Sequence, residues 1–324
     1  MRAAVLTTPG APLDLIEVPD PVAGPGQAVV EVLACGICHS DLHAAAGDYA
    51  TKLPVILGHE VAARHERLGP VLVYACWGCR QPDCWACSSQ QEMICPDATE
   101  AGLLRDGGYA ERMLVPDEAY LVPLGGLEPA KAAPLACGGL TAYRAVDHTL
   151  DALRAVARPR ALVIGAGGLG QFGLQFLKIR SDAEVVVVDA SPEKRALAVG
   201  LGADAAVAPG EAEGSFTAVV DFVGAEATLQ TARDHVRRQG IVVAVGLYGG
   251  TIPFGFGAVP HEARFMTSVW GTLAQLRELV ALAQAHDLHS EIEIVPLDEV
   301  QSAHERLAAG RVSGRFVLAP GSAS

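Results

Sequence analysis

The sequence lacks a long apolar run, an excess of positive charge and a secretory leader. No stretch approaches the roughly 18 consecutive apolar residues that a membrane-spanning helix needs. The formal net charge is −13, which disfavours nucleic acid or an anionic membrane surface as the main partner. The start, MRAAVLTTPG, has neither a sustained apolar core nor a small-residue cleavage site. We therefore expect a cytoplasmic protein with neither a nucleic-acid nor a membrane partner.

The chain has neither internal repeats nor low-complexity segments, and its size suggests two domains. It contains 324 residues, of which 50% are hydrophobic, and its mean hydropathy is +0.28. That content is sufficient for two hydrophobic cores and too high for a disordered chain. In a cytoplasmic protein, the eight cysteines are expected to act as metal ligands or reactive thiols rather than as a disulfide framework.

The pattern of apolar residues changes near Gly138. Before it, short β-like runs such as 28–33 and 72–75 alternate with Gly and Pro. After it, valine-rich apolar runs typical of strands buried on both faces alternate with helical patterns. We predict strands at 161–164, 185–188, 219–223 and 241–245, and helices at 169–179 and 192–201, the second capped by Ser191 with Pro192 at its first position. This βαβ series predicts a doubly wound parallel sheet.

The C-terminal part predicts a helix from about Leu273, a small helix near 297–309 and a last strand at 315–319. These elements are expected to return to the first domain. We therefore predict an α/β protein with a β-rich catalytic domain at 1–138, completed by 272–324, and a dinucleotide-binding domain at 139–271.

A glycine-rich turn supports the dinucleotide-binding domain. It follows one predicted strand and opens a helix, and its five candidate cofactor residues are Gly165, Gly167, Gly168, Leu169 and Gly170. Such glycines permit close approach of the backbone to a pyrophosphate, while the helix N-terminus supplies N–H donors. Asp189 ends the next strand, 24 residues after Gly165, where a carboxylate can bind the ribose hydroxyls. Its alternative role is that of a strand-end cap. Val245, at the end of the fourth strand, is a further cofactor candidate.

Four cysteines at short spacing predict a structural metal site: Cys79, Cys84, Cys87 and Cys95. Four thiolates satisfy the tetrahedral coordination of a zinc ion that needs no open position. Cys76 is an alternative to Cys79 as the first ligand, and free surface thiols or redox chemistry through Cys76 and Cys79 are the competing interpretations.

A second group of residues suits catalysis. The segment GICHSDLHAAAGDY holds Cys38, Asp41 and other polar groups, His59 follows in LPVILGHE, and Cys137 lies in PLACGGLTAYRA. A catalytic zinc takes three protein ligands and keeps one position open, and its histidine ligand needs a carboxylate to hold the tautomer. Cys38, His59 and Cys137 can supply the ligands and Asp41 the carboxylate.

These motifs, together with VIGAGGLG and GRFVL, resemble those of the zinc-containing medium-chain alcohol dehydrogenases across nearly the whole chain. The resemblance implies a GroES-like catalytic domain and a Rossmann domain. It also implies two zinc ions per subunit, NAD as the cofactor and a homodimer or homotetramer. It assigns Cys38, His59 and Cys137 to the catalytic zinc.

The resemblance also assigns roles to the neighbouring residues. Glu60 matches a carboxylate near the metal, Ser40 and His43 match a proton relay, and Asp41 matches the partner of His59. Three further residues match cofactor contacts: His39, Lys194 and Arg315.

The sequence departs from the family pattern at three places. Four residues lie between Cys79 and Cys84 instead of two, and a turn of about ten residues is missing between Ala62 and Val71. Only eleven residues separate Val207 from Val219. A parallel crossover usually needs a dozen or more, so we expect its helix to be truncated or absent.

The predicted activity is reversible hydride transfer between a primary or secondary alcohol and NAD, giving an aldehyde or ketone. The alternatives are a zinc polyol, sugar or formaldehyde dehydrogenase on the same scaffold, a zinc-free quinone reductase and a non-catalytic NAD sensor. The zinc-free branch would leave the cysteine and histidine groups without a role. Tyr49 and Trp270 are expected to line the substrate pocket.

Overall fold

The computed structural model describes residues 1–312 and 314–321, so positions 313 and 322–324 of the predicted returning segment lie outside the described residues. Its contacts divide the chain into two units. Unit 1 comprises Met1–Leu140 and the segment that begins at Gly271, and unit 2 is Thr141–Trp270. Helix α4 (Gly138–Arg154) contains the boundary. In the part of the chain that the structure describes, no helix is both long and apolar enough to cross a membrane.

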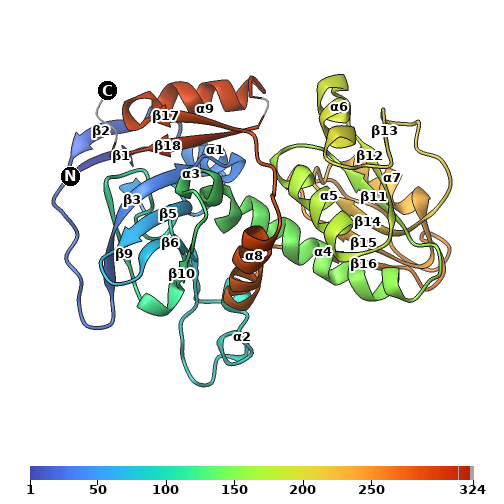
Figure 1. Ribbon diagram of the computed structural model, residues 1–324, viewed down its shortest axis with the longest axis horizontal. Helices are drawn as coiled ribbons and strands as arrows, with labels where there is room; N and C mark the ends of the chain where they lie inside the picture. The colour runs from blue at the N-terminus through green and yellow to red at the C-terminus, as the bar shows by residue number, and fades with distance from the viewer. Residues whose placement is uncertain (313, 322–324) are drawn as a thin grey trace. The chain divides into compact units, whose positions relative to one another are not determined.

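Unit 1 is built on a mixed sheet in which distant segments pair (Figure 1). Its path of neighbouring strands is β10-β6-β5-β3-β18-β17, and β9 also pairs with β3. Their bounds are β3 (Ala28–Gly36), β5 (Glu60–His65), β6 (Gly69–Val73), β9 (Arg112–Val115), β10 (Leu121–Pro123), β17 (Ile292–Pro296) and β18 (Arg315–Ala319). Because β18 pairs with β3, the C-terminal segment completes the sheet that the N-terminal segment begins.

Shorter elements surround this sheet. A second sheet joins β1 (Arg2–Leu6), β2 (Asp14–Glu17) and β4 (Val55–Ile56), and a third pairs β7 (Cys76–Trp77) with β8 (Thr99–Glu100). The helices are α1 (His39–Ala46), α2 (Trp85–Ser88), α3 (Pro129–Ala132), α8 (Leu273–Ala285) and α9 (Val300–Ala308), with 3-10 turns η1 (Glu92–Ile94), η2 (Glu118–Tyr120), η3 (Ala133–Ala136) and η4 (Leu297–Glu299). The predicted C-terminal helices and last strand are thus present.

Unit 2 is a parallel sheet of six strands in the order β13-β12-β11-β14-β15-β16. The strands are β11 (Arg160–Ile164), β12 (Glu184–Val188), β13 (Ala205–Val207), β14 (Phe216–Asp221), β15 (Val236–Ala244) and β16 (Arg264–Thr267), and the helices are α5 (Gly168–Arg180), α6 (Pro192–Gly200) and α7 (Glu226–His235). The strand order turns around at β11, which is the doubly wound arrangement predicted from the valine runs. Ser191 caps α6 as predicted, because its side chain accepts the Lys194 N–H.

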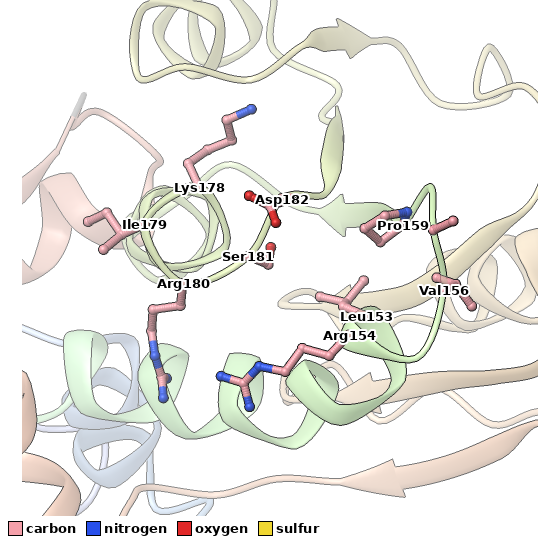
Figure 2. Close-up of a pocket in the computed structure, with 10 residues that line it drawn as sticks. Leu153, Arg154, Val156, Pro159, Lys178, Ile179, Arg180, Ser181 and Asp182 are labelled. Carbon is pink, nitrogen blue, oxygen red and sulfur yellow. The ribbon is translucent and has the colours of Figure 1, made fainter.

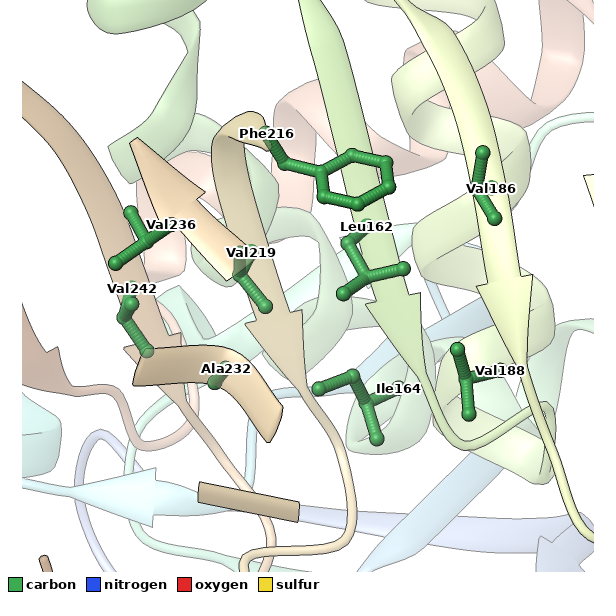
Figure 3. Close-up of a cluster of buried hydrophobic side chains, with 9 residues drawn as sticks. All are labelled: Leu162, Ile164, Val186, Val188, Phe216, Val219, Ala232, Val236 and Val242. Carbon is green, nitrogen blue, oxygen red and sulfur yellow. The ribbon is translucent and has the colours of Figure 1, made fainter. Parts of the chain in front are cut away.

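The core on one face of this sheet is formed mainly by branched side chains of its strands (Figure 3). Leu162 and Ile164 on β11 lie beside Val186 and Val188 on β12, because residues two apart in a strand share a face. The cluster is completed by residues of β14, α7 and β15: Phe216, Val219, Ala232, Val236 and Val242.

Two predicted strand bounds were wrong. The strand placed at 219–223 begins at Phe216 and ends at Asp221, whose side-chain Oδ1 accepts the N–H groups of Val223 and Gly224 at 2.8 and 3.0 Å. This bonding turns the backbone out of the ladder. The strand placed at 241–245 starts at Val236 and ends at Ala244, because β15 follows α7 directly and Val236 already pairs with Phe216, before an irregularity in the ladder that ends at Ile241.

The structure explains two of the departures from the family pattern. Strands β5 and β6 form a tight hairpin, in which His65 pairs with Gly69, so the missing turn leaves a short connection. Residues 208–215 join β13 to β14 without a helix. Eight residues reach at most about 28 Å. The connection must return along the six residues of β14 and cross three strand spacings, from β13 past β12 and β11 to β14, which requires about 24 Å. Little length therefore remains for a helix.

Candidate functional site

The segment CHSDLH begins helix α1 and aims its carboxylate inward. Cys38 is the N-cap residue, and Asp41 Oδ2 accepts the Cys38 N–H at 2.8 Å. A carboxylate at the third helical position commonly makes this reciprocal bond. Gly47, with φ of 89°, ends the helix. The local sequence therefore holds Asp41 in the interior, where its side chain is 2% exposed.

Two distant segments meet the segment of Cys38 and Asp41. Gly58, with φ of 93°, precedes His59, and His59 Nδ1 lies 3.2 Å from Asp41 Oδ1. Cys137 follows η3. One ligand atom from each of Cys38, His59, Glu60 and Cys137 lies within 4.8 Å of the others, and all four residues are buried. The structure thus brings together the three predicted ligands and the predicted nearby carboxylate.

The electrostatics of this group suit a cation. The pKa of Cys38 is lowered well below its ordinary value, chiefly because the Cys137 thiol donates to it and also because His59 lies beside it. Donation to Cys38 and burial raise the pKa of Cys137. Burial raises the pKa of Glu60 to about 7, against the opposing effect of Arg315. Glu60 Oε2 is buried and has no hydrogen-bond partner among the described residues. Soft thiolate and imidazole donors with a spare carboxylate oxygen fit zinc.

Arg315 forms a buried ion pair with Glu60, and the Gly138 N–H also donates to Glu60 Oε1, at 3.2 Å. Arg315 is 7% exposed. Its predicted role at the cofactor pyrophosphate stays a prediction. The observed contact gives it a further role, which is to compensate the charge of Glu60 beside the thiols.

The predicted relay residues lie along α1. Ser40 Oγ is 3.7 Å from Cys38 Sγ, and His43 Nδ1 is 2.8 Å from Asp48 Oδ2. The His43 side chain is 42% exposed, and its ring lies beside Tyr49 with 5.5 Å between centroids. His39 is exposed. The relay pair therefore runs from the buried group toward the surface.

The four-cysteine cluster also forms. The sulfur atoms of Cys79, Cys84, Cys87 and Cys95 all lie within 4.8 Å of one another, whereas Cys76 lies in β7 outside the group. The wider spacing after Cys79 includes Arg80, with φ of 56°, which turns the chain. The Cys87 N–H lowers the pKa of Cys84 to about 7. This arrangement favours Cys79 as the first ligand, and each of the eight cysteines is reduced.

In unit 2, the glycine-rich turn follows β11 and opens α5. Gly165 has φ of 89°, Gly167 is the N-cap residue, and Gly168 and Leu169 begin the helix. A Cβ on Gly170 would lie 1.8 Å from the carbonyl oxygen of Gly165, so this position excludes any side chain.

Asp189 lies over this turn. Its Oδ2 accepts the Ala166 N–H at 2.7 Å, and its Oδ1 accepts the Ser191 N–H at 2.8 Å. Asp189 therefore caps the end of β12, which was the alternative to its predicted cofactor role. Each of its oxygens keeps a second lone pair that could accept from a ribose hydroxyl. Lys194 lies in the first turn of α6. Val245 follows β15 and is buried.

Three residues near these groups make contacts that were not predicted from the sequence. Arg195 Nη1 donates to the carbonyl oxygens of Asp189 and Ala190 at 2.8 and 3.0 Å, a tether that its place five residues after Ala190 on a helix could have indicated. Tyr109 donates to Asp41 across 68 positions of sequence, and its hydroxyl also lies within hydrogen-bond distance of His304, across 195 positions. No local pattern marks either residue.

Figure 2 shows a pocket in unit 2, which lies at the N-terminal ends of β11 and β12, whereas the glycine-rich turn lies at the C-terminal end of β11. Pro159 precedes β11, and Ser181 and Asp182 precede β12, whereas the turn follows β11. Lys178 and Arg180 at this pocket are paired with Asp204 and Asp147 at 2.9 and 2.7 Å. The pocket is therefore separate from the predicted cofactor site.

Comparison with known proteins decides the family. Residues 24–126 match the alcohol dehydrogenase GroES-like domain, and residues 168–285 match the zinc-binding dehydrogenase domain. An alcohol dehydrogenase of Geobacillus stearothermophilus is 33% identical over 98% of this chain and 99% of its own length. The chain belongs to the zinc-containing alcohol dehydrogenase family. An NAD-dependent alcohol dehydrogenase of Sulfolobus acidocaldarius is 32% identical, over 98% of this chain and 99% of its own.

The fold agrees with this family. The crystal structure of the alcohol dehydrogenase from Aeropyrum pernix matches with a TM-score of 0.87 and 32% identity, over 99% of this chain and 100% of the other. The prediction of a GroES-like domain and a Rossmann domain is therefore confirmed, as is the family.

Proposed function

We propose that this chain is a zinc-dependent alcohol dehydrogenase that uses NAD. The observation that carries the proposal is the buried group of Cys38, His59 and Cys137, with Asp41 against His59 Nδ1. Two thiols and an imidazole are the donors of a catalytic zinc site that keeps one position open. A zinc ion held there would act as a Lewis acid that lowers the pKa of an alcohol.

The cofactor would bind unit 2. The backbone N–H groups at the start of α5 would hold its pyrophosphate, and Asp189 would accept from the ribose hydroxyls. His39, Lys194, Val245 and Arg315 are proposed as further cofactor contacts. NAD would supply the hydride acceptor.

The chain's own residues would move the alcohol proton. Ser40 would accept it and pass it to His43. Because an ionised Asp48 only accepts hydrogen bonds, His43 Nδ1 must carry the donated hydrogen, which leaves Nε2 of the neutral ring as the base. The half-exposed position of His43 then allows the proton to reach solvent.

The four-cysteine cluster is proposed to hold a second, structural zinc ion, because its four sulfurs leave no position for a substrate. Reduced cysteines used as ligands agree with the proposed cytoplasmic location.

A homodimer or homotetramer is also proposed. Strand β16 is the edge of the unit 2 sheet, and Phe254 and Phe256, in the segment before it, are 73% and 99% exposed. Unpaired strand edges beside exposed aromatic rings favour self-association. Sedimentation velocity would test this, and a monomer at micromolar concentration would refute it.

The activity is tested by a substrate scan. Protein purified without chelator is mixed with NAD+ and ethanol, 2-butanol, benzyl alcohol, sorbitol or an aldose, and NADH formation is followed. We expect turnover with at least one simple alcohol, and loss of turnover after removal of zinc. Faster turnover of sorbitol or the aldose would favour the polyol or sugar alternative. NADH binding without turnover of any substrate would favour a sensor.

A further inference from the structure

A buried chain of hydrogen bonds leads away from the candidate metal ligands. Asp41 Oδ1 lies 3.2 Å from His59 Nδ1, and Tyr109 Oη donates to Asp41 Oδ2 at 3.0 Å. Tyr109 Oη also lies 3.2 Å from His304 Nε2. The chain of bonds joins α1, the segment before β9 and helix α9, and Figure 1 shows α1 close to α9 in unit 1. It therefore ends in the part of unit 1 that the C-terminal segment supplies.

The chemistry of the groups sets the direction of each bond. An ionised carboxylate only accepts, so both His59 Nδ1 and the Tyr109 hydroxyl must donate to Asp41. The Tyr109 oxygen is then the acceptor for His304, whose Nε2 must carry a hydrogen. Every donor in the chain points toward Asp41.

The surroundings hold this geometry rigidly. Tyr109 is 0% exposed and His304 is 5% exposed. Burial lowers the pKa of His304, which favours the neutral ring. A Cβ on Gly58 would lie 2.3 Å from Tyr109 Cδ1, so the glycine before His59 makes room for the tyrosine ring. The Tyr109 and His304 rings meet edge to face, with centroids 5.7 Å apart.

We propose that Tyr109 and His304 are positioning residues for the metal site, acting through Asp41 on His59. The Tyr109 hydroxyl, oriented by His304, fixes the plane of the Asp41 carboxylate, and this plane aims the imidazole of His59. Carboxylates behind a histidine ligand hold its orientation and strengthen metal binding. The proposal deepens the proposed function, because it assumes that the site holds zinc.

The test measures zinc retention. The release of zinc to a chromogenic chelator is followed over time, and each of the two sites is expected to give one kinetic phase. The phase that belongs to the four-cysteine cluster is the one that is absent in Cys87→Ser. Removing a carboxylate behind a ligand typically costs 10–100-fold in metal affinity. Removing one donor to that carboxylate should cost less, so Tyr109→Phe should speed zinc loss from the remaining site by about fivefold to tenfold.

The variants of His304 test the order of the chain. His304→Leu removes the donor and should speed zinc loss several-fold, whereas His304→Gln keeps an N–H donor and should restore most of the retention. Because His304 acts through the Tyr109 hydroxyl, the double variant Tyr109→Phe with His304→Leu should lose zinc no faster than Tyr109→Phe alone. Multiplied effects in the double variant would refute the serial arrangement.

Tyr74→Phe is the matched control. Its hydroxyl is also buried in unit 1 and donates to the Gly271 carbonyl oxygen at 2.8 Å, away from Asp41. We expect zinc loss at the parent rate. Equal rates in Tyr109→Phe, Tyr74→Phe and the parent would overturn the proposal. If Tyr109→Phe does not fold, an unchanged rate in His304→Leu would overturn it instead.

The outcome is separable from that of the proposed function. A parent that oxidises alcohols but keeps zinc equally well in all variants refutes only the positioning role. A parent that holds zinc and responds to Tyr109→Phe, but oxidises no alcohol, refutes only the proposed reaction.

Discussion

We predict a preference for NAD over NADP, set by the carboxylate of Asp189. The carboxylate accepts two backbone N–H groups, from Ala166 and Ser191, so it cannot rotate away from the ribose position without losing a hydrogen bond. The 2′-phosphate of NADP would bring a second anion next to this fixed charge. Two unit charges about 5 Å apart repel by about 3 kcal/mol at an effective dielectric near 20.

That repulsion corresponds to roughly two hundredfold in affinity, since about 1.4 kcal/mol is tenfold. Arg195 reduces it, because its guanidinium is tethered to the carbonyl oxygens of Asp189 and Ala190. We therefore expect kcat/KM to favour NAD by somewhat less, roughly a hundredfold, because the guanidinium offsets part of the repulsion.

The assay compares kcat/KM for NAD+ and NADP+ in the parent and in Asp189→Gly, where the preference should fall at least tenfold. Asp204→Asn is the control. Asp204 also accepts a backbone N–H, from Val185 at 2.7 Å, but it lies just before β13, at the N-terminal ends of the strands, whereas Asp189 lies at their C-terminal ends. Its variant should keep the parent ratio. Equal use of both cofactors by the parent, or an unchanged ratio in Asp189→Gly, would show that this carboxylate does not select the cofactor.

Four further predictions concern the metal sites, the proton relay and the buried His304. Metal analysis should find two zinc ions per subunit in the parent and one in Cys87→Ser. The Tm of Cys87→Ser should be lower by about 5 °C or more, which corresponds to a free energy of unfolding lower by roughly 2 kcal/mol. Cys76→Ser should keep both ions, and a full zinc content in Cys87→Ser would exclude the cluster as a site. Cys38→Ser should abolish alcohol oxidation but bind NADH, measured by fluorescence titration, within about twofold of the parent, because the metal that Cys38 would hold acts on the alcohol rather than on the cofactor. His43→Ala should lose activity mainly at acid and neutral pH and recover with added buffer base, and an unchanged pH profile would remove His43 from the relay. Burial lowers the pKa of His304 below its ordinary value of 6.5, so the contribution of the neutral ring to stability is complete above that pH and is lost as the pH falls toward the folded pKa. Between about pH 6.5 and 5, Tm should therefore decline less in His304→Gln than in the parent. Parallel curves of Tm against pH for the two proteins would contradict this.

Most of unit 2 could be predicted from the sequence because its signals are local. A valine run, a glycine-rich turn and an apolar helix pattern each lie within one element, and the backbone geometry of a tight turn requires glycine at Gly165 and Gly170. The strand bounds were less accurate, because the end of β14 depends on a side-chain contact of Asp221 rather than on hydropathy.

Local chemistry also determined much of the candidate metal sites. Four cysteines between positions 79 and 95 can meet through turns of their own loop, and Cys38 and Asp41 meet within the first turn of one helix. The choice between Cys76 and Cys79 required the fold, because only the pairing of β7 with β8 removes Cys76 from the cluster.

The tertiary structure alone decided what surrounds the catalytic group. Arg315 reaches Glu60 across 255 positions, and His304 reaches Tyr109 across 195, only because the C-terminal strand and helix return to the sheet begun by β3. A polar side chain in a helix or strand has many possible partners, and the sequence does not record which one burial will select. The residues that can hold a metal were therefore visible in the sequence, whereas the buried charges and hydrogen bonds that orient them depend on long-range packing.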